Sequence, residues 1–365
     1  MKDKKTTTTL NFDSKLLKFQ KIVSIFEIRI NSKLAQNTRY FSTSMKKFYI
    51  VGIIGLMIFF SVNTAHSQDP QFTQFYANPL YLNPAFAGSI RCPRIALNTR
   101  IQWSGISGNY RTYAASYDQH IDPIQGGVGI RFYRDEAGQA TITSHNVAVM
   151  YSYLLKLSRK VSMRFGAEIG FLQRSLDTRN LTFGDMIDDR YGFVYATQEV
   201  FENNQKFMFD LGAGVLCYSD MFYGGVSFHH ITQPNEGFLG NSKLPFKLTA
   251  HFGSMIPIGS KRKYSGDAFI SPNVLFQLQQ SFYQVNVGVY AGKGPFVGGI
   301  WYRSNDSFIA LVGIQKGIFR IGYSYDITIS RLTNATAGSH EVSMGFQFGC
   351  QQPRKKFRTV RCPSF

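Results

Sequence analysis

The residues of this sequence that could carry chemistry are few, and their spacing matches no catalytic or metal-binding pattern. The chain has no nucleophile elbow, no HExxH and no paired carboxylates in a supporting context. His229 and His230 are adjacent, and neighbouring residues of a strand point to opposite faces, so we do not expect them to share a metal ion. The glycine-rich run 126–129 lies within a strand-like pattern and precedes no helix, which disfavours a phosphate loop. We therefore predict a protein that is not an enzyme and that holds neither a metal nor a cofactor.

The elements that must position the remaining polar residues begin after an export signal. Residues 48–60 form an apolar run of 13 residues behind two lysines. A helix needs roughly 20 residues to cross a bilayer, so this run is too short to span one. Ala65 and Ser67 follow as the small residues at the −3 and −1 positions of a cleavage site. We interpret residues 45–67 as a signal peptide and Gln68 as the first residue of the mature protein.

Residues 1–44 precede this signal, and the export machinery would have to pass over them. We interpret Met45 as the start of translation and residues 1–44 as a misassigned N-terminal extension. The alternative is a true amphipathic presequence, because several apolar residues could line one face of a helix: Leu16, Leu17, Phe19, Ile22, Val23 and Phe26.

The charge of the mature chain is smaller than that of the whole sequence. Residues 1–67 hold 11 of the 40 Lys and Arg residues and 3 of the 22 Asp and Glu residues, so the formal net charge falls from +18 to +10. Half of this excess lies in the tail 350–365, at Arg354, Lys355, Lys356, Arg358 and Arg361. The rest of the chain lacks the basic surface that nucleic acid requires. We predict no nucleic-acid partner, and we expect the basic tail to lie beside a membrane or an acidic partner.

From residue 91 onward, apolar and polar residues alternate with a period of two. In residues 281–290, four apolar side chains share one face, while Gln284, Asn286 and Gly288 lie on the other. This alternation predicts strands with one apolar face. Cutting the chain at turn signals gives about fourteen strands, near 92–103, 110–121, 127–135, 142–156, 161–175, 206–218, 221–231, 244–257, 267–279, 281–291, 295–303, 307–315, 317–328 and 340–349.

Two architectures have this pattern: a soluble sandwich with its apolar face inward, and a transmembrane barrel with its apolar face outward. Many of the expected strands have ten or more residues, whereas soluble strands have about five or six. Aromatic residues gather at strand ends, as in the aromatic girdles of membrane barrels, and short and long connections alternate. We therefore predict an all-β fold, a transmembrane antiparallel β-barrel of about fourteen strands over residues 91–349.

The face opposite the apolar one carries charged residues that we expect to point into the barrel: Arg100, Arg131, Arg164, Glu168, Asp210, Arg320 and Asp326. They could line a binding cavity or an ion path, or they could simply fill the lumen. The sequence leaves both interpretations open.

A closed barrel leaves no unpaired strand edge in lipid, so the last strand has to pair with the first. An even number of strands puts both termini on the short-turn side, which is periplasmic in outer-membrane barrels. Because Cys92 begins the first strand and Cys350 follows the last, we predict a Cys92–Cys350 or Cys92–Cys362 disulfide, with free thiols as the alternative. Cys217 shares an apolar face, and no cysteine lies in a CxxC, so zinc is not expected.

The segment 68–90 fits none of these strands. Its Asp-Pro and Asn-Pro steps fix extended or turn conformations, because proline disfavours helix at the residue before it and donates no backbone hydrogen bond. The segment nevertheless carries side chains that need burial: Phe72, Phe75, Tyr76, Tyr81, Leu82 and Phe86. It is either a periplasmic strap that plugs or braces the barrel, or a docking surface for a partner.

The order of residues in this segment carries a resemblance to a known family. Asp69-Pro70, Phe72-Thr73-Gln74-Phe75, Pro79, Asn83-Pro84-Ala85 and Ala87-Gly88, directly after a signal peptide, closely resemble the hallmark of the PorP/SprF family of the Bacteroidetes type IX secretion system. The resemblance runs from Gln68 to the final strand, and the tail after Gly349 departs from a minimal member. It implies an integral outer-membrane β-barrel that works with the type IX machinery.

The resemblance also implies a function. Such a barrel supports the secretion or surface anchoring of one large exported protein, commonly an adhesin and in some cases a gliding adhesin, by binding its C-terminal sorting domain. The expected partners are the type IX machinery, that exported protein and outer-membrane lipid, with loops such as 176–205 facing outward. The motif residues expected to bind a partner are Asp69, Pro70, Phe72, Gln74, Phe75, Tyr76, Pro79, Asn83, Pro84 and Gly88.

Two other functions compete with this one. A passive porin or a hydrophobic-substrate channel would conduct ions as the purified protein alone. A lipid-modifying enzyme would need a Ser/His pair at the membrane rim, and nothing in the sequence singles one out.

Overall fold

The computed structural model describes residues 69–158, 160–188, 190–198, 204–238, 240–258, 268–329 and 336–349. The predicted N-terminal extension, the signal peptide with Gln68, and the basic tail 350–365 lie outside the described residues. Among the residues that are described, no helix has both the length and the apolar character needed to cross a membrane.

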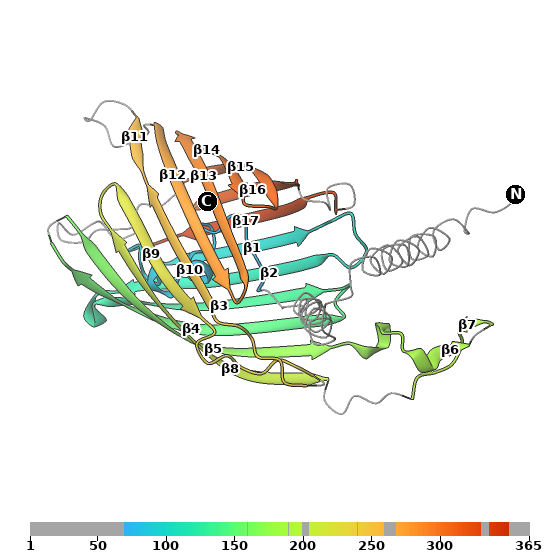
Figure 1. The fold of residues 1–365 in the computed structure, drawn as a ribbon. Helices are drawn as coiled ribbons and strands as arrows, with labels where there is room; N and C mark the ends of the chain where they lie inside the picture. The colour runs from blue at the N-terminus through green and yellow to red at the C-terminus, as the bar shows by residue number, and fades with distance from the viewer. Residues whose placement is uncertain are drawn as a thin grey trace, which may run out of the picture. The chain divides into compact units, whose positions relative to one another are not determined.

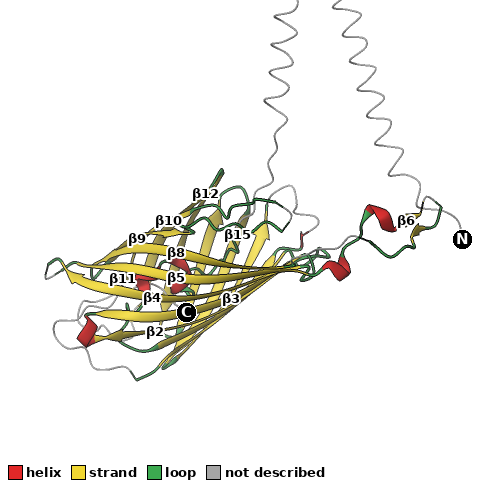
Figure 2. Cartoon of the chain, turned by 90° about the horizontal axis from the view of Figure 1, so that it is seen from below, coloured by secondary structure: helices red, strands yellow, loops and turns green. Residues whose placement is uncertain are grey.

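The described chain is an antiparallel β-barrel (Figures 1 and 2). Its strands are β1 (Arg94–Gln102), β2 (Tyr110–Ile121), β3 (Gly126–Ala137), β4 (Ile142–Lys156), β5 (Ser162–Leu176), β8 (Gln205–Tyr218), β9 (Phe222–His229), β10 (Lys247–Ser254), β11 (Ile256–Ile258), β12 (Ala268–Gln279), β13 (Phe282–Lys293), β14 (Phe296–Arg303), β15 (Ser307–Lys316), β16 (Phe319–Thr328) and β17 (Ser339–Gln347). Met255 alone separates β10 from β11, and both pair with β12, so they are two parts of one strand. The described barrel therefore has fourteen strands, which confirms the prediction.

The ring is closed by pairing between the first and last strands. β1 lies antiparallel to β17, from Arg94 opposite Gln347 to Gln102 opposite Ser339. On the far side of the ring, β10 pairs with β12. Closure satisfies backbone groups that would otherwise be unpaired in lipid. The predicted pairing of the first and last strands is confirmed.

The two ends of the barrel differ in their connections. One end, called here the short-turn end, has the connections 122–125, 157–161, 219–221, 294–295 and 317–318. The opposite end, called the long-loop end, has the longest connections, 177–204 and 230–246. Within the first of these, β6 (Ile187–Asp188) and β7 (Gly192–Phe193) form a separate hairpin.

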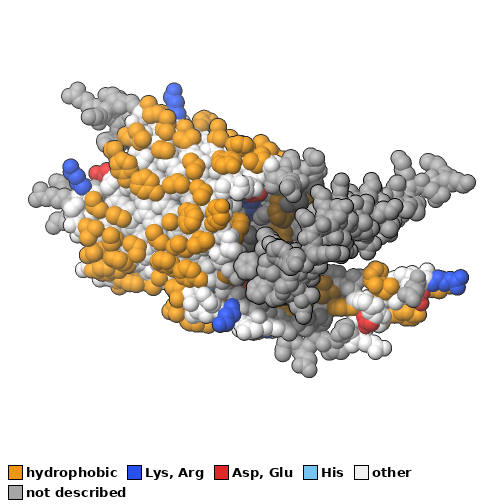
Figure 3. All heavy atoms as spheres, viewed as in Figure 1, with side chains coloured by type: hydrophobic (Ala, Val, Ile, Leu, Met, Phe, Trp, Pro, Cys, Tyr) orange, Lys and Arg blue, Asp and Glu red, His pale blue; other side chains and the backbone are white. Residues whose placement is uncertain are grey.

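Side chains alternate between the two faces of the wall. Apolar residues such as Val149, Phe171 and Ile300 are exposed on the outside. Figure 3 shows a broad hydrophobic surface on one face of the barrel. Six of the seven charged residues expected to point inward are buried, and Arg320 is half-buried. An apolar exterior around a polar interior is the pattern of a barrel whose outer face contacts lipid.

Candidate functional site

The barrel interior is occupied by residues 69–90, called here the plug segment. It contains one turn of α-helix, α3 (Pro79–Leu82), and one 3₁₀ turn, η1 (Pro84–Phe86). Both turns begin with proline, which suits a first helical position because it has no backbone N–H to leave unpaired. The side chain of Asn83 caps η1 by accepting a hydrogen bond from the backbone N–H of Ala85 at 2.9 Å. Local sequence therefore shapes the segment, and the barrel wall then encloses it.

Aromatic side chains fix the plug segment to the wall. Phe75 meets Trp301 of β14 edge to face, with ring centroids 4.7 Å apart. Phe86 stacks on His251 of β10 at 5.4 Å, on another side of the ring. Such pairs add about 0.5–1.5 kcal/mol each beyond the burial of their surface. Tyr81 contacts Tyr133 of β3 at 5.7 Å, six strands away from β14 around the ring. Contacts with such distant strands place the segment inside the lumen, where its apolar side chains are buried.

The wall beneath the plug segment is lined by glycines on four strands: Gly127, Gly129, Gly166, Gly214 and Gly225. A Cβ on Gly166 would lie 2.5 Å from the carbonyl carbon of Pro84 and 2.6 Å from the Cα of Ala85. A Cβ on Gly127 would lie 2.5 Å from the Cα of Gly88. Real Cβ atoms do not approach backbone atoms so closely. Only glycine at residues 127 and 166 therefore leaves room for the plug segment. We call this surface the glycine floor.

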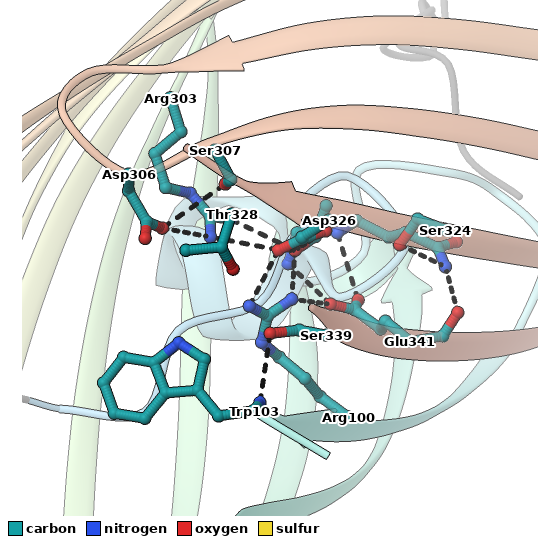
Figure 4. A network of polar contacts seen from close by, with 12 residues as sticks. Arg100, Trp103, Arg303, Asp306, Ser307, Ser324, Asp326, Thr328, Ser339 and Glu341 are labelled. Carbon is teal, nitrogen blue, oxygen red and sulfur yellow. Dashed lines mark hydrogen bonds and ion pairs between the residues drawn. The ribbon is translucent and has the colours of Figure 1, made fainter. Parts of the chain in front are cut away.

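A buried charge cluster joins the plug segment to β1, β14 and β16 (Figure 4). Arg100 lies 2.8 Å and Arg303 3.1 Å from the same Oδ2 atom of Asp326. The hydroxyl of Thr73 donates to that carboxylate at 2.7 Å and accepts from both guanidinium groups. Burying charges is tolerated when they are paired and hydrogen-bonded, as they are here.

Glu341 of β17 completes the cluster by accepting from the plug backbone. Its two carboxylate oxygens accept hydrogen bonds from the backbone N–H groups of Thr73 at 2.6 Å and Gln74 at 3.0 Å. The side chain of Gln74 donates to the carbonyl of Glu341 and accepts from the hydroxyl of Ser343. Arg303 also pairs with Asp306 at 3.2 Å, so two arginines face three carboxylates in the cluster. The wall thereby satisfies the polar groups of an otherwise irregular segment.

Two further arginines bind backbone carbonyls of the plug segment. Arg131 donates to the carbonyl of Leu80 at 3.0 Å and forms an ion pair with Glu168 at 2.5 Å. Arg164 donates to the carbonyls of Ala87 and Gly88, each at 2.7 Å. Both arginines were predicted to point inward, and both hold the plug segment through hydrogen bonds to its backbone carbonyls.

At the long-loop end, Asp69 lies in a cluster with His230 and Lys247. Its carboxylate is 2.8 Å from His230 Nε2 and 3.2 Å from Lys247 Nζ, while His230 Nδ1 lies 2.7 Å from Asp210. His229 and His230 were predicted to lie on opposite faces, and this was wrong: both point inward, His229 toward Glu168 and His230 toward Asp210. His230 follows the end of β9 with a positive φ of 57°, so strand alternation no longer governs it. The described residues contain no group of acidic, histidine or cysteine side chains arranged to hold a metal.

This cluster sets the protonation of its members. Burial by itself lowers the pKa of His230, but attraction to Asp69 and hydrogen bonds to Asp210 and Asp69 outweigh burial and raise the pKa to about 10. Burial by itself raises the pKa of Asp69, but attraction to His230 and Lys247 outweighs it and holds the pKa far below its ordinary value. His230 is therefore a cation and Asp69 an anion at neutral pH.

We expect the attachment at Asp69 to weaken at both extremes of pH. The contribution of His230 is complete below about pH 6.5, the ordinary pKa of histidine, and is lost as the pH rises through about 10. The contribution of Asp69 is complete above about pH 4 and is lost on acidification. Thermal unfolding across this range, followed by the fluorescence of Trp301 in a Trp103→Phe background, measures the effect. His230→Gln should lower stability at neutral pH and abolish the alkaline decline, whereas His340→Gln should do neither; an unchanged alkaline decline in His230→Gln would contradict the assignment.

The structure brings together the ten motif residues expected to bind a partner, all within the plug segment and against the barrel wall. Tyr81, which was not among them, donates to the carbonyl of Pro70, and Gly88 donates its N–H to Asp118 at 2.9 Å. Their part in binding a partner stays a prediction. Thr73, Arg303, Glu341 and the glycine floor were not predicted from the sequence, although inward-facing charge and glycine at alternate positions are visible signals there.

The structure describes two of the four cysteines, Cys92 and Cys217. Cys92 takes part in a disulfide, and Cys217 is a free, half-buried cysteine on the outward face of β8. Cys350 and Cys362 lie outside the described residues, so the predicted pairing with one of them stays a prediction.

Comparison with known proteins places the chain in a family. Residues 64–346 match the family described as Type IX secretion system membrane protein PorP/SprF. The comparison with curated proteins gives no match. Solved structures with a similar arrangement include a KdgM porin (TM-score 0.34, 10% identity, 70% of this chain and 99% of that chain). They also include Omp33 of Acinetobacter baumannii (TM-score 0.41, 8% identity, 72% and 100%) and a FadL homologue of Pseudomonas aeruginosa (TM-score 0.41, 10% identity, 78% and 100%). Because the family match covers most of the chain, including both the plug segment and the barrel, the protein belongs to the PorP/SprF family of type IX secretion system membrane proteins.

Proposed function

We propose that this outer-membrane β-barrel retains one large exported protein at the cell surface by binding its C-terminal sorting domain at the long-loop end, in association with the type IX machinery. The exported protein would be an adhesin or a similar surface protein, including one used in gliding. The observation that carries the proposal is that the plug segment occupies the lumen. Nearly every side chain of the plug segment is buried against the wall, which favours a binding role over passive conduction.

The hairpin β6–β7 supports the position of the contact. The carboxylate of Asp188 accepts hydrogen bonds from the backbone N–H groups of Arg190 at 2.8 Å and Tyr191 at 2.9 Å, and from the hydroxyl of Tyr195 at 2.9 Å. This bonding gives the hairpin a defined shape while it presents exposed aromatic side chains at Tyr191, Phe193 and Tyr195. Exposed, rigidly held aromatic residues are the kind that anchor protein–protein contacts.

We expect the combined changes Tyr191→Ser, Phe193→Ser and Tyr195→Ser to reduce recovery of the retained protein at least tenfold, because aromatic anchors dominate binding energy. Affinity capture of a tagged barrel from detergent-solubilised outer membranes, with mass spectrometry, measures recovery. Phe296→Ser, an exposed aromatic residue at the short-turn end, is the matched control. Equal recovery from the triple variant and wild type would argue against the hairpin as the contact. Steady ion conductance by the purified wild-type protein, with no partner recovered, would favour the porin alternative.

A further inference from the structure

We infer that the plug segment is threaded through the whole barrel, so that the first residues of the mature chain emerge at the long-loop end. The chain enters β1 from the opposite, short-turn end. This inference does not depend on the identity of the retained protein. It departs from the sequence-based expectation that both termini lie on the short-turn side.

The C-terminal part of the plug segment is fixed at the short-turn end. Gly88 lies against the backbone of Gln119, His120 and Gly127, close to where β2 ends and β3 begins. Arg91, just beyond the segment, forms a 2.7 Å ion pair with Asp122, which lies in the short connection between those two strands.

The N-terminal part is fixed at the long-loop end. The backbone N–H of Asp69 donates to the side chain of Gln279 at 3.2 Å, and its carboxylate meets His230 and Lys247. In the strand register, Lys247 lies opposite both His229 and Gln279. The three wall residues that hold Asp69 therefore belong to one edge of the barrel, where β9 and β12 end and β10 begins.

Contacts between these two ends connect them along the lumen. Ala85 lies on Gly166, near the start of β5, and the carbonyl of Leu80 meets Arg131, midway along β3. Tyr76 lies back in the short-turn half, where it contacts Tyr223 near the start of β9 and Tyr290 near the end of β13. Thr73 then meets Asp326, close to where β16 reaches the long-loop end. The segment therefore folds back once within the lumen, and its N-terminal residues end at the long-loop end.

The direction of threading decides which partners can reach the plug segment. In outer-membrane barrels the longer loops face the cell exterior and the short turns face the periplasm. Cleavage after Ser67 would leave a single residue in front of Asp69. A partner outside the cell can then bind the free end of the plug segment at the cluster of Asp69, His230 and Lys247. A periplasmic partner meets only the part of the segment that leads directly into β1.

Site-specific labelling of living cells tests the inference. A Gly-Ser-Cys tripeptide inserted between Gln68 and Asp69 should react with a membrane-impermeant maleimide on intact cells, to the same extent as Tyr191→Cys. Lys316→Cys, at the short-turn end, should react only after the outer membrane is permeabilised. Mass spectrometry of the individual tryptic peptides identifies the labelled residue, so the native cysteines do not interfere. Labelling of the insertion only after permeabilisation, or in neither condition, would overturn the inference.

A single substitution provides a second measurement that an insertion cannot disturb. In Gln68→Ser, whose first residue cannot cyclise to pyroglutamate as an N-terminal glutamine does, a membrane-impermeant amine reagent applied to intact cells should modify the α-amino group of the peptide that ends at Arg91. Modification of that amine only in permeabilised cells would place the end on the periplasmic side and reject the threading.

Discussion

We expect Gly166→Ala to displace the plug segment from the barrel wall. Gly170→Ala, which changes another inward-facing glycine of β5, should be tolerated. The added methyl group at residue 166 would lie 2.5 Å from the carbonyl carbon of Pro84 and 2.6 Å from the Cα of Ala85. These are backbone atoms, which cannot rotate away as a flexible side chain can. At residue 170 the nearest atom is Nδ2 of Asn146 at 3.6 Å, an ordinary contact. Overpacking typically costs about 1–3 kcal/mol, and a clash with three backbone atoms, the N of Ala85 among them, belongs at the upper end.

Two measurements distinguish loss of the plug from loss of the barrel. Chymotrypsin should cleave residues 69–90 in Gly166→Ala while the strands stay protected, and the protein should gain ion conductance in planar bilayers. Gly170→Ala should match wild type in both. If the plug segment of Gly166→Ala stays protected from chymotrypsin, the wall must move to accept the methyl group. The glycine floor would then not be required for binding the plug segment.

Arg100→Ala will be the most destabilising single change in the charge cluster. The guanidinium group is buried and pairs with Asp326 at 2.8 Å and Glu341 at 3.4 Å. Its removal leaves two neighbouring carboxylates buried with one fewer cation. Breaking a buried ion pair in this way costs about 3–5 kcal/mol. The plug segment should loosen at Thr73, which accepts a hydrogen bond from Arg100.

The fluorescence of Trp301, which contacts Phe75 of the plug segment, reports this loosening during thermal unfolding. Adding Asp326→Asn to Arg100→Ala should recover part of the lost stability, because the second change removes a buried carboxylate that has lost one of its two arginines. Arg179→Ala, in an exposed ion pair with Asp177, should leave stability unchanged. A double variant no more stable than Arg100→Ala would indicate that Arg100 acts by filling space and not by its charge.

The barrel could be predicted from the sequence because a two-residue period is a local signal. Each of the fourteen expected strands lies within about three residues of an observed one, and the first and last strands pair. The error occurs where the period breaks, because His230 turns inward by adopting a positive φ just beyond β9.

The site was only half predictable, for a physical reason. Aromatic residues and Asn-Pro steps showed that the segment 68–90 needed burial without being a strand. They did not show where it was buried, because its partners are distant in sequence: the bond from Thr73 to Glu341 joins residues 268 positions apart. The glycine floor was hidden for the same reason, since Gly127 and Gly166 read as ordinary strand glycines until the segment lies upon them.

The contact between Thr73 and Glu341 also has a consequence for the order of assembly. The plug segment is the first part of the mature chain to be made, yet the carboxylate that holds its backbone belongs to β17, the last strand. Arg100 and Asp326, on the strands flanking β17, bind the same threonine. The plug segment therefore cannot make these contacts until synthesis is complete and β17 has closed the ring. In a truncated or unclosed barrel, the N-terminal segment lacks these hydrogen bonds. Docking of the plug is thus a late, non-local folding step, and protection of residues 69–90 marks a finished molecule.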